Sequence, residues 1–442
     1  MLTDAELRSL ADHALAASDA DQTEVIVSDV ESSLTRFASN EIHQNVAERS
    51  FSLTVRAVVG KKIGVATTND LSDEGVRRVV ERAGMIARHS PDNPDFHSLP
   101  GPTPIPAADG WRETTARFSP EARALLAEPL CRRAHEEGLS AAGSIETRAE
   151  QTAVANSLGV FAIARHTTAG AVAVVMGESG SGYADRFSID AADLDAEDLA
   201  SDVLGRARRA QKPIDLPVGD YPVVLEPYAV ADLLLYLGYL GFGAQSVQEQ
   251  TSFLAGRFGE RVMGENISIW DDPTGPGVVP EPFDPEGVPS RRVDLVVDGV
   301  AAGVVYDTLT AGRDGKQSTG HALQPGSTFG PLARHLYLAP GTVDDLVRSI
   351  GRGLLVTRFW YTRPVHFLTV TMTGMTRDGL FLIENGEVVA PVKNMRFTQS
   401  YLAAMNDVLA IGRSTKLQIE EGCYRVPGVA IGHWSFTGKT DF

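Results

Sequence analysis

The chain has little cysteine and no concentration of positive charge. Its 442 residues include two cysteines, Cys131 and Cys423, which are too few for a disulfide framework. No run of Lys and Arg is longer than two residues, and the net charge is −17. Nucleic acids and anionic membranes both bind basic surfaces, so we expect neither as a direct ligand. A reducing compartment and a neutral or cationic partner, such as a peptide, are compatible with this composition.

The sequence also lacks a stretch that is long and apolar enough to cross a membrane. The segment LLLYLGYLGFGAQSVQ (233–248) contains no charged residue and no histidine. A spanning helix needs roughly 20 apolar residues, and this segment is shorter and includes Gln and Ser. The N-terminal MLTDAELRSLADHALAAS is acidic and broken by polar residues, unlike a signal peptide. We therefore expect a cytoplasmic protein.

Helical and alternating patterns in the first half predict an α+β domain. Thr3 and Glu6 form a T-x-x-E capping box before apolar residues at helical spacing. Apolar and polar residues alternate from Thr23 to Thr68, which is typical of antiparallel strands. The order helix, sheet, helix then repeats, so we predict a single antiparallel sheet covered on one face by helices. The Pro-rich segment 212–222 ends this domain, which we assign to residues 1–212.

The second half, residues 213–442, is predicted to form a β-rich domain of the barrel or sandwich kind. Short apolar runs alternate with Gly- and Pro-containing turns. Asn385-Gly386 lies between LFLI and VVAPV and is a strong signal for a β-hairpin. Two helices are expected in this domain, TVDDLVRSIGRGLL at 342–355 and a buried helix at 231–243.

Sequence motifs by themselves identify no catalytic site. The glycines of segment 233–248 match neither G-x-G-x-x-G nor G-x-x-x-x-G-K-[ST], and GESGSG (177–182) has Ser where G-x-S-x-G requires its last Gly. No C-x-x-C, H-E-x-x-H, H-E-x-x-x-H or H-x-H occurs, so the common zinc motifs are absent. One alternative remains open, namely an enzyme that acts alone through His321 with Asp307 or Cys423.

Several long segments of the second half carry a family resemblance. They are SFLAGRFGERV (252–262), PFDPEGVPSRRVDLVVDGVAAGVVYDTLTA (282–311), STGHA (318–322) and TGMTRDGLFLIENGEVVAPVKNMRFTQS (373–400). On these segments the chain resembles the TldD/PmbA family of peptidase-related proteins, and weaker similarity extends over the first half. The resemblance implies an N-terminal α/β domain and a β-rich C-terminal domain. It also implies pairs of related cytoplasmic subunits that act on unfolded peptides.

The resemblance further implies where a metal would lie, and the ligands are missing there. In the TldD-type subunit, an H-E-x-x-x-H helix before the AGR-x-GERV run supplies two zinc ligands and the general base, and a later cysteine completes the site. Counting back from the AGR run places the two ligands at Leu235 or Tyr236 and at Leu240 or Gly241. None of these can bind zinc, and CYRVPG surrounds Cys423 where the family has a CGK pattern. The chain therefore resembles the TldE-like PmbA branch, and we expect no cofactor in it.

The preferred hypothesis is a non-catalytic subunit of a TldD/TldE-type metallopeptidase complex that processes peptides. Zinc and activity are then expected only together with a TldD-type paralogous partner, and a homodimer is the alternative assembly of the isolated chain. We expect peptide or partner to contact a cleft lined by Tyr236, Tyr239, Phe242, His321 and Arg257. The alternatives are the stand-alone hydrolase above and a protein-interaction module, such as a modulator of a DNA-acting enzyme.

Overall fold

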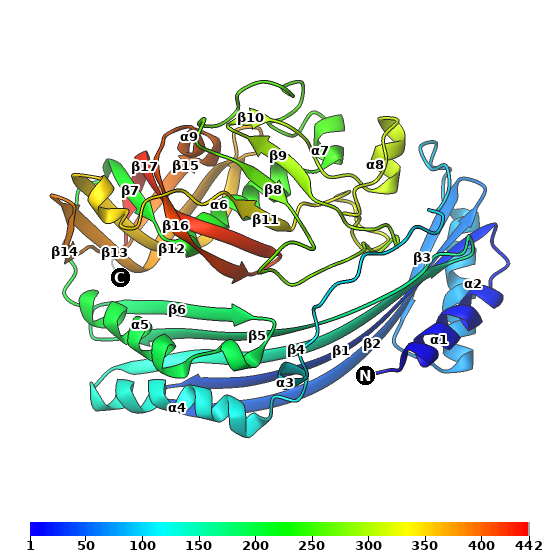
Figure 1. Cartoon of the computed structure of the whole chain (residues 1–442), viewed down its shortest axis with the longest axis horizontal. Coiled ribbons are helices and arrows are strands. Elements are labelled where there is room, and N and C mark those ends of the chain that lie inside the picture. The colour runs from blue at the N-terminus through cyan, green and yellow to red at the C-terminus, as the bar shows by residue number, and fades with distance from the viewer. Residues whose placement is uncertain (441–442) are drawn as a thin grey trace.

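The computed structural model describes residues 1–440, which fold into two halves that lie against each other (Figure 1). Within these residues, the first half contains a six-stranded antiparallel sheet in the order β3-β2-β1-β4-β5-β6. The long central strand β1 pairs with β2 on one side and with β4 on the other. The strands are β1 (Gln22–Ala38), β2 (Glu41–Val59), β3 (Lys62–Thr68), β4 (Ser140–Asn156), β5 (Phe161–Met176) and β6 (Ser181–Ser188).

Helices cover one face of this sheet, as predicted. Val25, Val27 and Phe37 alternate along β1 and pack against these helices in two apolar clusters. Figure 1 shows α1, α2 and α4 on the side of the sheet away from the second half. The predicted capping box is present at α1, because the Thr3 hydroxyl accepts from the Glu6 amide while the Glu6 carboxylate accepts from the Thr3 amide. The helices are α1 (Asp4–Ala16), α2 (Asp73–His89), α3 (Glu113–Ala116), α4 (Pro120–Glu136), the 3₁₀ turn η1 (Ala191–Asp193) and α5 (Ala196–Arg209).

The second half is rich in strands and partly closed. Over the described residues its sheet has eleven strands, and β17 pairs with both β15 and β7. The path β17-β15-β13-β12-β7 is therefore a closed ring, which confirms the predicted barrel-like character. Trp434, Phe397 and Phe359 pack together among these strands. The strands are β7 (Gly219–Leu225), β8 (Ile269–Asp271), β9 (Val293–Val297), β10 (Val300–Ala301), β11 (His335–Leu338), β12 (Arg352–His366), β13 (Thr371–Glu384), β14 (Glu387–Pro391), β15 (Met395–Ser400), β16 (Val408–Ile419) and β17 (Cys423–Lys439).

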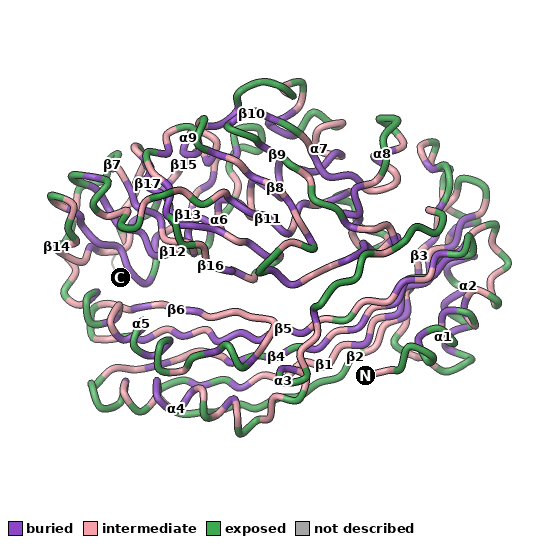
Figure 2. Tube along the Cα trace, viewed as in Figure 1, coloured by how far each residue is buried: buried purple, intermediate pink, exposed green. Residues whose placement is uncertain are grey.

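Helix α6 (Pro227–Gly241) fills the inside of this half and packs against β12 and β17. It starts four residues before the predicted 231–243 and ends two residues earlier, and α7 (Ala244–Gln248) follows. In Figure 2 buried residues concentrate in α6 and the surrounding strands, whereas the outer loops are exposed. No helix within residues 1–440 is long and apolar enough to cross a lipid bilayer. The remaining helical elements are α8 (Thr308–Arg313), the 3₁₀ turn η2 (Val347–Ser349) and α9 (Tyr401–Asn406).

The prediction of a helix at 342–355 is wrong. Residues 347–349 form only the 3₁₀ turn η2, and β12 begins at Arg352. Leu354 and Val356 pair with β7 and β13, and their burial in the sheet outweighs the helical spacing of the segment. The hairpin predicted at Asn385-Gly386 is confirmed between β13 and β14, with φ values of 53° and 75° that suit a type I′ turn.

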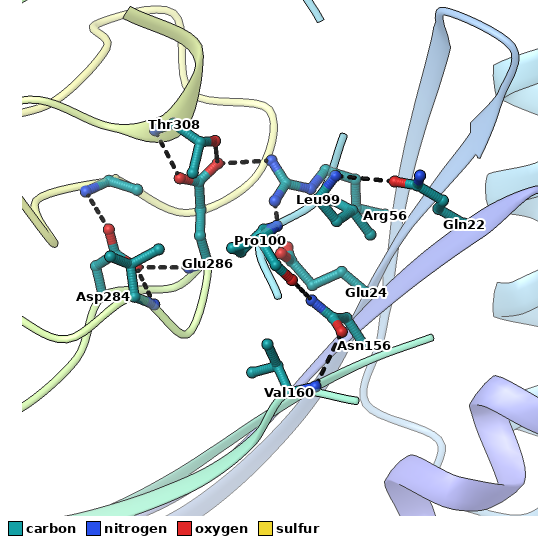
Figure 3. Close-up of polar contacts among 12 residues, drawn as sticks. Gln22, Glu24, Arg56, Leu99, Pro100, Asn156, Val160, Asp284, Glu286 and Thr308 are labelled. Atoms are coloured by element: carbon teal, nitrogen blue, oxygen red, sulfur yellow. Dashed lines mark hydrogen bonds and ion pairs between the residues drawn. The ribbon is translucent and has the colours of Figure 1, made fainter. Parts of the chain in front are cut away.

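A buried ion cluster joins the two halves (Figure 3). Arg56 of β2 donates to Glu24 of β1 at 2.5 Å and to Glu286 of the second half at 3.1 Å. Glu286 also accepts from the amide and the hydroxyl of Thr308, at 2.9 and 2.7 Å. Burial raises the pKa of Glu24 to about 7, even though Arg56 opposes the shift. At this contact between the halves, Arg56 is therefore the charged partner of both Glu24 and Glu286.

Candidate functional site

One stripe of α6 borders a cleft of about 500 Å³. The stripe consists of Asp232, Leu235, Tyr236 and Tyr239, whose spacing of three or four residues places them on one side of the helix. These four side chains remain at least partly exposed, whereas the leucines on the other side of α6 are buried. The volume lies within the range of small-ligand sites.

The other walls come from β12 and from the turn between β16 and β17. All six residues of segment 358–363 line the cleft, together with Glu420 and Glu421. Strand β12 is irregular here, because its register with β13 shifts between Trp360 and Arg363 and Tyr361 has a φ of 57°. The ring of Phe359 packs inward on Trp434, and the irregularity after Trp360 brings further neighbouring residues to the cleft where a regular strand would place alternate ones on the opposite face.

Asp232 is the acidic residue of α6 and has a strongly shifted pKa. Its Oδ1 accepts a hydrogen bond from the Tyr401 hydroxyl at 2.5 Å. Burial raises the pKa of Asp232 to about 7, and the hydrogen bond from Tyr401 opposes this shift. One turn further along, the Tyr236 hydroxyl donates to the carbonyl oxygen of Thr362 at 2.7 Å. Two tyrosine hydroxyls thus fix α6 to α9 and to β12, and the cleft holds a carboxyl that can exchange a proton near neutral pH.

The two arginines of the cleft are engaged with groups of the protein. Arg358 donates from Nε to Asp378 at 2.8 Å, and its guanidinium lies 4.2 Å from the ring centroid of Tyr183. Arg363 donates to the carbonyl oxygen of Thr362 at 2.8 Å and lies 5.1 Å from the ring centroid of Tyr361. Both guanidinium groups are therefore held at the wall by hydrogen bonds and aromatic rings.

The five residues predicted to share one cleft are separated in the structure. Tyr236 and Tyr239 line the cleft beside α6, and their contact with peptide stays a prediction. Phe242 is buried against Phe253, because α6 ends at Gly241 and the helical spacing no longer applies beyond it. His321 is buried in another part of the second half, and Arg257 lies in an exposed loop beside Glu260. The prediction that all five residues line one cleft is therefore corrected, because only Tyr236 and Tyr239 border it.

The catalytic pair considered for a stand-alone enzyme does not form. His321 uses both ring nitrogens, Nε2 with Asp271 at 2.8 Å and Nδ1 with the carbonyl oxygen of Thr319 at 2.9 Å. Asp307 caps α8 by accepting from the Thr310 amide. The prediction failed because His321 and Asp307 lie in the same loop-rich region but bond to different groups.

Sequence reasoning missed the histidine that does lie beside Cys423. Strands β11 and β17 pair in parallel and place His335 opposite Cys423. Burial alone would lower the pKa of His335, but Glu281, followed by Cys423 and Asp271, raises it to about 9. No motif joins His335 and Cys423, because they are far apart in the sequence. Both are more than nine-tenths buried, so this cluster is closed to a substrate.

The residues present do not fit the zinc site that the family resemblance implies. Leu235 and Tyr236 border the cleft, Leu240 is buried, and Gly241 has no room for a side chain. A Cβ at Gly241 would lie 2.0 Å from Cε1 of Phe253. In the part of the chain that the structure describes, no three His, Cys, Asp or Glu side chains gather as metal ligands would. No metal-dependent step is assigned to this helix.

The cleft also contains residues that the sequence did not single out. Asp232 could have been found, since it stands four residues before Tyr236 on the same side of a predicted helix. Trp360, Tyr361, Glu420 and Glu421 could not, because only the irregularity of β12 and the pairing of distant strands bring them to α6.

Comparisons with known proteins extend over most of the chain. The family model described as PmbA/TldA metallopeptidase C-terminal domain matches residues 218–438, and the model of PmbA/TldA metallopeptidase domain 1 matches residues 23–87. Metalloprotease PmbA of Escherichia coli O157:H7 is 25% identical over 444 residues, which cover 94% of this chain and 93% of that protein. An uncharacterised protein of Methanocaldococcus jannaschii is 42% identical over 101 residues, 23% of this chain and 24% of that one. The structure of TldE from Thermococcus kodakarensis matches with a TM-score of 0.90 at 20% identity, covers 98% of this chain and 100% of its own, and shows a shared fold.

Proposed function

Because the chain belongs to the PmbA/TldA metallopeptidase family, we propose that it is the TldE-like, non-catalytic subunit of a two-subunit metallopeptidase. A TldD-type paralogous subunit then carries the zinc and the bond-breaking step. One observation carries the proposal. The resemblance implies that the family's metal ligands lie on the helix that is α6 here, and the implied positions hold Leu235, Tyr236, Leu240 and Gly241.

In this proposal the cleft beside α6 holds peptide and does not cut it. Among the described residues, strand β7 pairs with β12 only over Leu354–Val356, so one edge of β12 has no strand partner along segment 358–363, which lines the cleft. An extended peptide can add to such an edge through main-chain hydrogen bonds, which suits substrates of varied sequence. Tyr239 and Trp360 offer ring surfaces for peptide side chains.

The proposed setting is the cytoplasm. Cys131 and Cys423 are both free thiols, which suits a reducing compartment. The acidic net charge of −17 gives no basic footprint for nucleic acid and leaves a protein partner and a peptide as the proposed ligands.

Reconstitution with a TldD-type paralogue from the same genome tests this function. Zinc content and peptide hydrolysis are measured for each chain alone and for the mixture. We expect this chain to bind no stoichiometric zinc and to cleave nothing alone, and the mixture to form a complex that is several-fold more active than the paralogue. A paralogue with its H-E-x-x-x-H glutamate changed to Gln is the control, since its complex should form without hydrolysis. Absence of a complex, or stoichiometric zinc in this chain, would overturn the proposal.

A further inference from the structure

We propose that the cleft beside α6 selects a cationic group of a bound peptide, either its free α-ammonium or a lysine side chain. The proposal rests on the proposed function only for the identity of the ligand as a peptide. The preference for positive charge follows from the residues that line the cleft.

Carboxylates dominate the charge of the cleft. Asp232, Glu420 and Glu421 all line it. Within residues 1–440, the Glu420 and Glu421 side chains make no ion pair or hydrogen bond. Burial raises the pKa of Glu420, and the neighbouring charge of Glu421 raises it further. A cation placed between these two carboxylates would relieve their repulsion.

The positive charges of the cleft do not cancel this acidity. Arg358 is matched by Asp378, whose carboxylate lies outside the cleft lining and accepts from the guanidinium. Among the described residues, Arg363 has no carboxylate partner, and it lies against the ring of Tyr361. One such cation faces three carboxylates, so an anionic ligand group would be repelled and a cationic one attracted.

The aromatic walls suit the same ligand. The guanidinium groups of Arg358 and Arg377 already lie 5.1 and 4.6 Å from the ring centroid of Trp360, so this wall accepts cations. In the described chain no cation of the protein lies over Tyr236 or Tyr239, which stand on the same stripe of α6 as Asp232. Tyr239 packs against Phe329 but is 38% exposed, so part of its ring can contact an ammonium group from a ligand.

Among the described residues, a buried hydroxyl at the cleft has no well-formed hydrogen bond. Within residues 1–440, the Oγ1 atom of Thr362 makes no hydrogen bond of good geometry, although it interacts with the nearby Asp232 and Tyr401 side chains; the residue is only 4% exposed and lines the cleft. Buried polar groups are normally well satisfied, so this hydroxyl still has capacity for a better-placed donor. An ammonium group has three donors, which Thr362 and the carboxylates can share.

Four short peptides, labelled and amidated at the C-terminus, test the proposal on the isolated full chain. The probes are a tetra-alanine with a free amine, its N-acetylated form, and acetylated forms with one central Lys or one central Glu. Fluorescence anisotropy gives the dissociation constants. We expect at least one of the two cationic probes to bind about ten-fold more tightly than the neutral one, as a partly desolvated charge pair implies. The cationic probe that binds more tightly identifies the group that is recognised.

A matched pair of double variants separates the cleft from general charge effects. The variant E420Q/E421Q removes two carboxylates from the cleft, and E41Q/E48Q removes two exposed, unpaired carboxylates from β2. We expect the cationic preference to disappear only in the first variant. Equal affinities for cationic and neutral probes, tighter binding of the Glu probe, no binding of the cationic probes at about 1 mM, or equal losses in both variants would each overturn the proposal.

The same measurements remain informative if the subunit proposal fails. If no complex forms with the paralogue but the cationic preference is present, the cleft assignment stands and the subunit role falls. If the complex forms and the preference is absent, the subunit role stands and the cleft assignment falls.

Discussion

The hydroxyl of Tyr401 donates to Oδ1 of Asp232 over 2.5 Å and ties α9 to the carboxyl of α6. Asp232 stands at the start of a long apolar stretch, where an ionised carboxylate is costly. Its pKa of about 7 reflects that cost, and the bond from Tyr401 offsets part of it. A carboxyl oxygen can accept from Tyr401 whether or not the group is protonated, so the contact tolerates both states.

Replacing Asp232 with Asn should flatten the pH dependence of stability. The pKa of Asp232 is raised from its ordinary 3.8 to about 7 in the folded chain. Its contribution to stability is therefore fully present below the ordinary value and is lost as the pH rises through about 7. The wild type should lose stability relative to Asp232→Asn between about pH 4 and about pH 7, by at most about 1.4 kcal/mol per pH unit, and the difference should level off above that range. Urea unfolding across this range measures the difference, and Asp12→Asn on the exposed side of α1 should change nothing. Parallel curves for wild type and Asp232→Asn would contradict the assignment.

Removing Arg56 should weaken the contact between the two halves. The side chain is 13% exposed and holds Glu24 and Glu286, which are almost fully buried. Arg56→Met leaves both carboxylates without a cation, which should cost about 3–5 kcal/mol. Arg77→Met, which breaks an exposed pair with Glu74, should cost at most about 1 kcal/mol. Denaturant unfolding compares the two, and similar losses would show that the cluster does not stabilise the contact.

The chain should lose stability at alkaline pH through His335. The pKa of His335 is raised from 6.5 to about 9, so its stabilising charge is fully present below 6.5 and is lost as the pH rises through about 9. The melting temperature of the wild type should therefore fall between pH 7 and 9.5. The variant His335→Gln should be less stable than the wild type at pH 7 and should lose less on going to pH 9.5. A variant that melts in parallel with the wild type would show that Glu281 does not hold this charge.

Short sequence motifs correctly predicted the helix start and the hairpin turn, whose structure depends on neighbouring residues. The capping box at Thr3 and the Asn385-Gly386 turn are satisfied by neighbouring backbone groups, so their sequences were sufficient. Segment 342–355 has helical spacing, but strands distant in sequence recruit Leu354 and Val356 into the sheet. Predictions failed where long-range pairing decides the local structure.

The same division applies to the cleft. Tyr236 and Tyr239 could be placed on one side of α6 because a helix repeats every 3.6 residues. Phe242 could not, because the helix ends one residue earlier. Trp360 lies in β12, whose irregular register is set against the distant β13, and Glu420 lies in the turn between β16 and β17.

Close packing at the end of α6 gives a last prediction. A Cβ on Gly241 would lie 2.0 Å from Cε1 of Phe253, so Gly241→Ala must displace that ring. We expect a loss of about 1–3 kcal/mol in the free energy of unfolding. Gly205 in α5 is the matched control, because a Cβ there meets nothing within 4 Å, and Gly205→Ala should stabilise by about 0.5–1 kcal/mol.

The ring of Phe253 also determines whether a metal-binding side chain can be accommodated at position 241. A double-mutant cycle of Gly241→Ala with Phe253→Leu should recover part of the loss, since the smaller side chain makes room for the added methyl group. Additive losses would mean that the backbone, and not the ring, resists the substitution. If the cycle shows coupling, a single Gly241→His would clash with the same ring and should unfold the end of α6 without binding zinc. Measured zinc binding by that single variant would contradict the argument.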